Sequence, residues 1–276
     1  MNMDLSWNLA PSVLIGMGLW TAAYLLITGR WRRERGWGAP PSTWRQAAFH
    51  LGTLVGLLAL VSPLDELGDE YLFSAHMVQH LLLLYVTAPC WLLGTPEWLP
   101  SLVVPTRWLS VARRIAGSGG TLIVFAGVLL AWHLPAAYGF AQEHEAAHIV
   151  EHLMYMGAGL IGWWPIAGPA DSVLGRPSAP ARMLYLFAMA LPCSFLGAML
   201  TFAQTPLYGY YVAAPHVFGL SVLEDQRLGG LLMWVPTHML LLVCLTIIGG
   251  QWLNGKEPTT GMSPETSIPQ GANLHE

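Results

Sequence analysis

Histidine pairs at helical spacing point to metal chemistry in this chain. The 276-residue sequence contains ten histidines, and four of them form two pairs with the same separation, namely His76 with His80 and His148 with His152. On a helix, residues four positions apart project from one face, so each pair can direct two imidazole rings toward one ion. Glu151 lies on the same face as His148, and Met156 extends that stripe by one turn. The spacing therefore predicts a metal site formed by two helices.

Copper and zinc are the two metals that these side chains suit. Copper binds imidazole together with thioether sulfur, and Met77, Met154 and Met156 lie close to the pairs in sequence. Zinc binds imidazole together with carboxylate, which Glu151 supplies. We expect copper, with zinc as the alternative. The candidate metal ligands are His76, His80, His133, His148, Glu151, His152 and Met156.

The composition indicates that a membrane surrounds these residues. Hydrophobic residues make up 54% of the chain and charged residues 10%, whereas an average soluble domain carries roughly 25% charged residues. So little charge cannot cover the surface of a soluble protein of this size. The formal net charge of −4 argues against binding to nucleic acid. We therefore expect the lipid bilayer, and no nucleic acid, as a partner.

The apolar stretches predict an all-α polytopic membrane protein with seven transmembrane helices, because about 20 apolar residues cross a bilayer. The expected spans are 11–28, 46–62, 72–93, 121–139, 147–167, 183–203 and 228–250. Proline removes a backbone hydrogen bond and kinks a helix, and four prolines lie inside these spans: Pro89, Pro135, Pro192 and Pro236. We expect a seven-helix transmembrane domain over 1–254 and a flexible cytoplasmic tail over 255–276.

Basic residues predict the orientation of these spans. Eleven of the twelve Lys and Arg residues lie in the connections 29–45, 94–120 and 168–182 or in the C-terminal tail, and positively charged connections stay on the cytoplasmic side. The N-terminus is therefore expected outside and the C-terminus in the cytoplasm. Acidic residues such as Asp69 fall on the outer face, and eight of the ten histidines fall in the outer half or near the midplane. Both histidine pairs thus start at the same membrane face, where they could converge.

Two further segments bear on how the helices pack. The outer connection 204–227 contains Tyr208, Tyr210 and Tyr211, which predicts an interfacial cap rather than free coil because tyrosine favours membrane interfaces. Gly52 and Gly56 form a GxxxG pair on the second expected span, and such pairs let helix backbones approach closely. We expect this pair to serve packing within the chain.

A set of short segments spread over residues 10–250 matches one protein family in the same order. The segments are His76 to His80 with Ala88 and Pro89, Trp132 to Pro135 with Tyr138, His148 to His152, Trp163 to Pro165, and Asp225 and Gln226 with Gly229, Gly230, Met233 and Trp234. Each segment is short, but as a set they are specific. On these residues the chain resembles the seven-helix CtaG family of assembly proteins for caa-type cytochrome c oxidase.

The resemblance implies a multi-pass protein of the bacterial plasma (inner) membrane that helps to assemble a haem-copper oxidase, with cytochrome c oxidase subunits as partners. It also implies a role in copper provision. We expect copper to arrive from an extracytoplasmic donor, to bind near the outer face and to pass to the oxidase by ligand exchange, without enzymatic catalysis. The polar positions that match the family are His76, His80, His133, His148 and His152.

Three other interpretations stay open from the sequence. His148, Glu151 and His152 fit the HxxEH pattern of inverted zinc peptidases, so the chain could be a membrane-embedded zinc hydrolase. His80 and His152 could instead be axial ligands of a haem held between helices. The histidines could also be purely structural, in which case they would hydrogen-bond neighbouring helices.

Overall fold

Helices form the whole of the regular structure in the part of the chain that can be described. The computed structural model describes residues 6–117, 119–169 and 172–255, and no strand occurs among them. The all-α fold class is therefore confirmed. The expected cytoplasmic tail, 255–276, lies outside the described residues except for Gly255.

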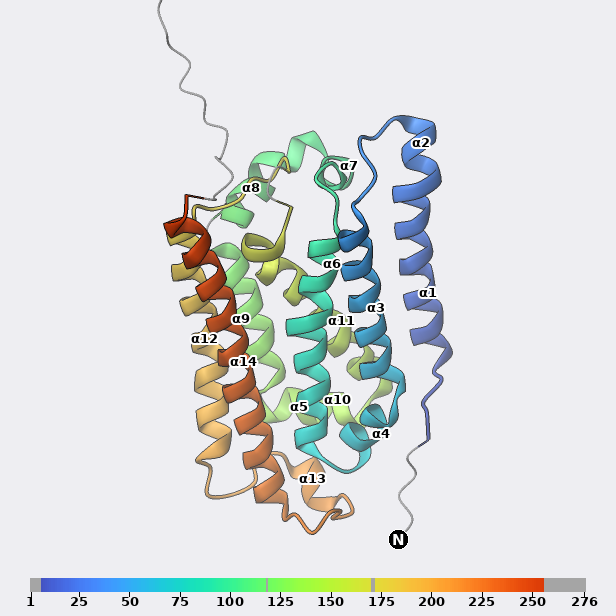
Figure 1. The fold of residues 1–276 in the computed structure, drawn as a ribbon. Coiled ribbons are helices and arrows are strands. Elements are labelled where there is room, and N and C mark those ends of the chain that lie inside the picture. Colours follow the sequence, from blue (N-terminus) through green and yellow to red (C-terminus); the bar gives the residue numbers. More distant parts are fainter. Residues whose placement is uncertain (1–5, 118, 170–171, 256–276) are drawn as a thin grey trace, which may run out of the picture.

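The helices follow one another with short connections (Figure 1). The first half of the chain contains α1 (Pro11–Leu26), the π-helical turn η1 (Ile27–Trp31), α2 (Arg32–Arg35), α3 (Thr43–Val61), α4 (Pro63–Glu70), α5 (Phe73–Leu82), the π-helical turn η2 (Leu83–Thr87), α6 (Ala88–Gly94), α7 (Leu99–Val103), the 3-10 turn η3 (Thr106–Trp108) and α8 (Leu109–Gly117). The second half contains α9 (Gly120–Trp132), α10 (Pro135–Glu143), α11 (Glu145–Ala167), α12 (Ala179–Thr201), α13 (Gly209–Ala213) and α14 (Val222–Leu253).

Five helical stretches are long and apolar enough to cross a membrane: Pro11–Arg35, Thr43–Val61, Phe73–Gly94, Ala179–Thr201 and Val222–Leu253. The described residues contain a sixth if the bent pair Thr106–Ala116 and Gly120–Trp132 counts as one span. The 23-residue helix α11 covers the expected span 147–167, but its first half carries two glutamates and two histidines and is less apolar. Seven spans and the outside position of the N-terminus therefore stay predictions.

The expected span 121–139 is wrong, because the helix breaks inside it. Helix α9 ends at Trp132, and α10 begins at Pro135. Proline is favoured in the first turn of a helix and forces the preceding residue into an extended conformation, as the φ of −64° and ψ of 130° at Leu134 show. Pro89 instead lies in the first turn of α6, directly after the π-helical turn η2, and the helical stretch Phe73–Gly94 continues through it. The break leaves His133 at the end of α9.

Small residues let the helices approach closely at several points. At Gly197 of α12, an added Cβ would lie 2.8 Å from the Cβ of Trp234 on α14. At Gly52 of α3, it would lie 2.8 Å from the Cβ of Cys90 on α6. Real Cβ contacts are not that short, so each position requires glycine. The GxxxG pair of α3 therefore contributes to packing within the chain.

The two ends of the bundle are built differently. Helices α4, α10 and α13 lie at the lower end in Figure 1, and α2, α7 and α8 lie at the upper end. In the connection between α12 and α14, Tyr208 and Tyr211 are both buried, and the hydroxyl of Tyr208 donates to the carbonyl of His133 over 3.0 Å. This connection thus caps the lower end, as expected for 204–227.

Candidate metal centre

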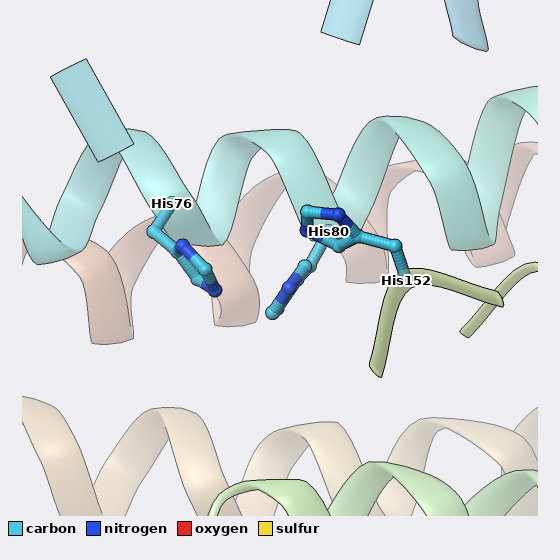
Figure 2. Close-up of side chains that lie close together, drawn as sticks. All are labelled: His76, His80 and His152. Atoms are coloured by element: carbon cyan, nitrogen blue, oxygen red, sulfur yellow. The ribbon is translucent and has the colours of Figure 1, made fainter. Parts of the chain in front are cut away.

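Three imidazole rings from two helices meet inside the bundle near this capped end. His76 and His80 project from α5 and His152 from α11, and their rings point toward one another (Figure 2). One ring nitrogen from each lies within 4.8 Å of the other two. The three side chains are 0%, 4% and 8% exposed. We call these three residues the buried trio.

Four of the six ring nitrogens of the buried trio lack a hydrogen-bond partner in the described chain, whereas Nδ1 of His76 lies 3.4 Å from Nε2 of Gln142. Nε2 of His76, both ring nitrogens of His80 and Nε2 of His152 are buried and accept or donate no hydrogen bond to the described chain. Buried polar atoms are otherwise nearly always hydrogen-bonded, because an unpaired one carries a large desolvation cost. A metal ion that accepts the imidazole lone pairs would remove this cost. The trio therefore fits a metal ion and leaves further coordination positions open.

A buried carboxylate lies beside the trio. Oε1 of Glu151 is 3.8 Å from Nε2 of His80, and neither carboxylate oxygen has a hydrogen-bond partner in the described chain. The Glu151 side chain is almost fully enclosed. A cation bound by the trio would be attracted by this carboxylate, so Glu151 belongs to the candidate centre even though it is not one of the three converging ligands.

A second group of potential ligands shares one histidine with the trio. Nδ1 of His76 and Nε2 of His148 each lie 3.6 Å from Oδ1 of Asp69, and the three donor atoms lie within 4.8 Å of one another. Asp69 belongs to α4, outside the candidate spans, and burial raises the pKa of its carboxyl to about 6. We call Asp69, His76 and His148 the outer group.

Helix α5 is held in place by a residue from the far end of the sequence. Asp225 of α14 accepts hydrogen bonds from the backbone nitrogens of Phe73 and Ser74 over 2.7 and 3.2 Å. These are orphan donors of the first turn of α5, which has no cap from its own preceding residue. Asp225 thereby fixes where α5 begins and hence where His76 and His80 point.

Specific contacts also hold helix α4 against α5. An added Cβ at Gly68 would lie 2.9 Å from the Cα of His76, so only glycine permits this approach. The hydroxyl of Tyr211 donates to the carbonyl of Gly68 over 2.6 Å, and Nε2 of Gln79 donates to Oδ1 of Asp65 over 2.6 Å. Burial and the nearby Asp69 raise the pKa of Asp65 to about 6. These contacts position Asp69 over the histidines.

Two of the expected ligands lie apart from both groups. Nδ1 of His133 is 2.7 Å from the carbonyl oxygen of Leu129 and 3.1 Å from the hydroxyl of Tyr155, although its Nε2 is buried without a partner. Met156 packs against the apolar cluster formed by Ala59, Leu60 and Leu83. The structure thus brings His76, His80, His148, Glu151 and His152 together and gives Met156 a packing role.

Asp69 is the potential ligand that sequence reasoning missed. It lies seven residues before His76, in a different helix, and the sequence marks it only as one of several acidic residues on the outer face. The capping role of Asp225 could not be predicted either, since 151 positions separate Asp225 from the Ser74 that it binds. The segment match that included Asp225 was the only signal pointing to it.

Three mycobacterial proteins, each described as uncharacterized, are similar to this chain. Those of Mycobacterium bovis and Mycobacterium tuberculosis are 24% identical over 199 residues, which cover 66% of this chain and 30% of theirs. The protein of Mycobacterium leprae is 23% identical over 219 residues, which cover 72% of this chain and 33% of its own. The chain thus spans about a third of the length of these relatives. No solved structure matches it.

A family model matches nearly the whole bundle. The model describes the cytochrome c oxidase caa3 assembly factor family, and the match extends over residues 22–255. These residues include both histidine pairs, Glu151 and the capping residue Asp225. The chain belongs to the family of caa3 cytochrome c oxidase assembly factors.

Proposed function

We propose that this assembly factor binds copper with His76, His80 and His152 and hands it to cytochrome c oxidase. The observation that carries the proposal is the convergence of three buried imidazoles, each with at least one ring nitrogen that has no hydrogen-bond partner in the described chain. The family supports a role in oxidase assembly, and a haem-copper oxidase needs copper to become active. Copper is here the cargo of the protein.

The coordination chemistry favours transfer over permanent storage. Imidazole nitrogen suits copper, and three imidazoles leave room for a ligand from the receiving protein. The buried carboxylate of Glu151 would balance the charge of the ion. Transfer then requires only that ligands of the oxidase replace imidazoles of the trio one after another, and no covalent bond of a substrate is broken. A non-enzymatic role agrees with the description of the family.

The direction of transfer follows from the position of the centre in the bundle. The trio lies near the end formed by α4, α10 and α13, where acidic residues such as Asp69 and Glu70 lie. The basic connections lie at the opposite end, which the positive-inside rule makes cytoplasmic. We therefore propose a plasma-membrane location, an extracytoplasmic copper donor and an oxidase subunit as the acceptor.

The geometry argues against the haem protein and leaves the choice between copper and zinc to metal analysis. His148 and His152, which would share one zinc in an HxxEH site, have ring centroids 4.3 Å apart. The ring centroids of His80 and His152 lie 5.2 Å apart, edge to face, whereas two axial imidazoles are separated by the plane of the porphyrin.

Metal analysis of the purified protein tests the proposal. Full-length protein is produced with copper in the medium, purified and assayed for copper and zinc, together with a His76→Ala/His80→Ala variant. The control is His144→Ala, because His144 is an exposed histidine near the same end and stacks on Phe140. We expect copper in the wild type and the control but not in the double variant. Equal copper in all three proteins, or zinc in place of copper, would contradict the proposal.

A further inference from the structure

The outer group has the donor atoms of a metal site of its own. Asp69 comes from α4, His76 from α5 and His148 from α11, and Asp69 Oδ1 is 3.6 Å from each of the two imidazole nitrogens. Oδ1 of Asp69 and Nε2 of His148 are buried and have no hydrogen-bond partner in the described chain. Three donor atoms from three helices thus face one another, in a mixed oxygen and nitrogen set that suits Cu(II).

Two residues of the outer group are more exposed than any residue of the buried trio. The side chain of Asp69 is 29% exposed, that of His148 is 15% exposed, and that of His76 is fully buried. His80 and His152 lie beyond His76, with ring centroids 4.1 and 6.0 Å from it. An ion that enters from this end therefore meets Asp69 and His148 before it meets His80 and His152.

The position of Asp69 is built into the fold. Helix α4 is held by the close approach of Gly68 to the backbone of His76 and by the hydrogen bond from Tyr211 to the carbonyl of Gly68. Its neighbour Glu70 is exposed and has no such constraint. The carboxylate of Asp69 is therefore held in a fixed position, whereas Glu70 contributes only charge.

We infer that Asp69, His76 and His148 form an entry station, at which copper binds before it passes to the buried trio. This inference rests on the proposed copper function. In the transfer, the Asp69 carboxylate and the His148 imidazole release the ion, and the imidazoles of His80 and His152 take their places. Neutral imidazoles bind through a lone pair, so the exchange needs no electron; the single ring hydrogen of His76 moves from Nε2 to Nδ1 when the ligating nitrogen changes, and no proton leaves the protein.

The shared residue His76 limits the protein to one ion at a time. A neutral imidazole has one nitrogen that carries a hydrogen and one that offers a lone pair. His76 can therefore serve the entry station or the buried trio, but not both at once. The expected stoichiometry is one copper ion per chain, although there are two groups of ligands.

Loading kinetics of the intact protein test the entry station. Full-length protein in lipid nanodiscs is mixed with Cu(II), the reaction is stopped with EDTA at increasing times, and the EDTA-resistant copper is measured. Asp69→Asn should slow loading by about tenfold, since loss of a supporting ligand typically changes metal binding by 10–100-fold. The final amount of copper should stay at one ion per chain, because the buried trio is intact. His148→Ala should behave in the same way.

The matched control is Glu70→Gln, which removes an equal charge from the neighbouring position. It should change the loading rate by less than about twofold, since an exposed charge acts only through screened attraction. Loading of Asp69→Asn at the wild-type rate, equal slowing by Glu70→Gln, or two ions per chain would overturn the entry station. A different result would contradict the proposed copper function itself: His80→Ala and His152→Ala would retain as much EDTA-resistant copper as the wild type.

Discussion

His238 and His80 lie in two regions of the bundle and differ in how their ring nitrogens are hydrogen-bonded. His238, in the α12–α14 pair, has Nε2 2.7 Å from the hydroxyl of Ser194 and Nδ1 2.6 Å from the carbonyl of Trp234. His80, between α5 and α11, has neither nitrogen hydrogen-bonded in the described chain. A structural histidine uses its nitrogens to join helices, whereas a ligand histidine keeps a lone pair for an ion. Hydrogen bonding thus separates the two roles.

The largest expected effect is on copper affinity, which should fall when His80 is replaced but not when His238 is replaced. We expect His80→Ala to weaken copper binding by about 100-fold, the upper end of what changes around a metal site cost, and His238→Ala to leave the affinity unchanged. Competition against a copper chelator of known affinity measures both. An equal loss of affinity in the two variants would mean that hydrogen bonding does not distinguish the two regions.

Glycine substitutions should have the second-largest effect, and their effect on copper binding should differ between the two regions. Gly68→Ala on α4 and Gly197→Ala on α12 each place a Cβ against backbone or side-chain atoms at 2.8–2.9 Å, and such overpacking costs about 1–3 kcal/mol of stability. Both variants should unfold more readily in a detergent titration. Only Gly68→Ala should also weaken copper binding, since its added Cβ would push against the Cα of His76, a ligand of the buried trio. Equal copper affinity in the two glycine variants would contradict this.

The cap on α5 should have an intermediate effect. Asp225→Ala removes the acceptor for the backbone nitrogens of Phe73 and Ser74, and loss of an N-cap costs about 1 kcal/mol. Because α5 carries two ligands of the trio, copper binding should weaken as well. Asp225→Asn keeps one acceptor oxygen and should lose less on both measures. A stability loss without any change in copper binding would show that the start of α5 does not orient the trio.

The smallest effect should come from the hydrogen bond between α12 and α14. Ser194→Ala removes the partner of His238, and hydrogen bonds between membrane helices contribute about 0.6 kcal/mol on average. A detergent titration should register this small loss, while copper binding stays at the wild-type level. A drop in bound copper would instead connect the α12–α14 pair to the metal centre.

The sequence predicted the helical class and most helix positions because its signals are local. Apolar runs, basic connections and the i, i+4 histidine pairs can all be read within one helix, and both pairs lie where they were expected, on α5 and α11. The error at 121–139 had a local cause too, since Pro135 begins a new helix rather than bending the old one. Predicting helices in a bilayer is easier than predicting contacts, because each helix satisfies its own backbone hydrogen bonds.

The composition of the candidate centre depended on contacts between distant parts of the chain. Met156 was expected to continue the ligand stripe, but it packs against the apolar cluster of α3 and η2. Which side chains a turn of α11 contacts depends on the helices packed against that turn, and the sequence of α11 does not specify them. Asp69 reaches the histidines only because Gly68 lets α4 approach α5. No periodicity within α4 or α5 encodes that approach.

The sequence by itself determined the residue types and the faces on which they lie: two imidazole pairs at the spacing of a helical turn, in a chain too apolar for water. Only the tertiary structure decided that these faces meet, that Asp69 joins them and that Asp225 fixes the start of α5. The physical reason is that spacing along a helix is set by local backbone geometry, whereas convergence depends on how closely separate helices can pack.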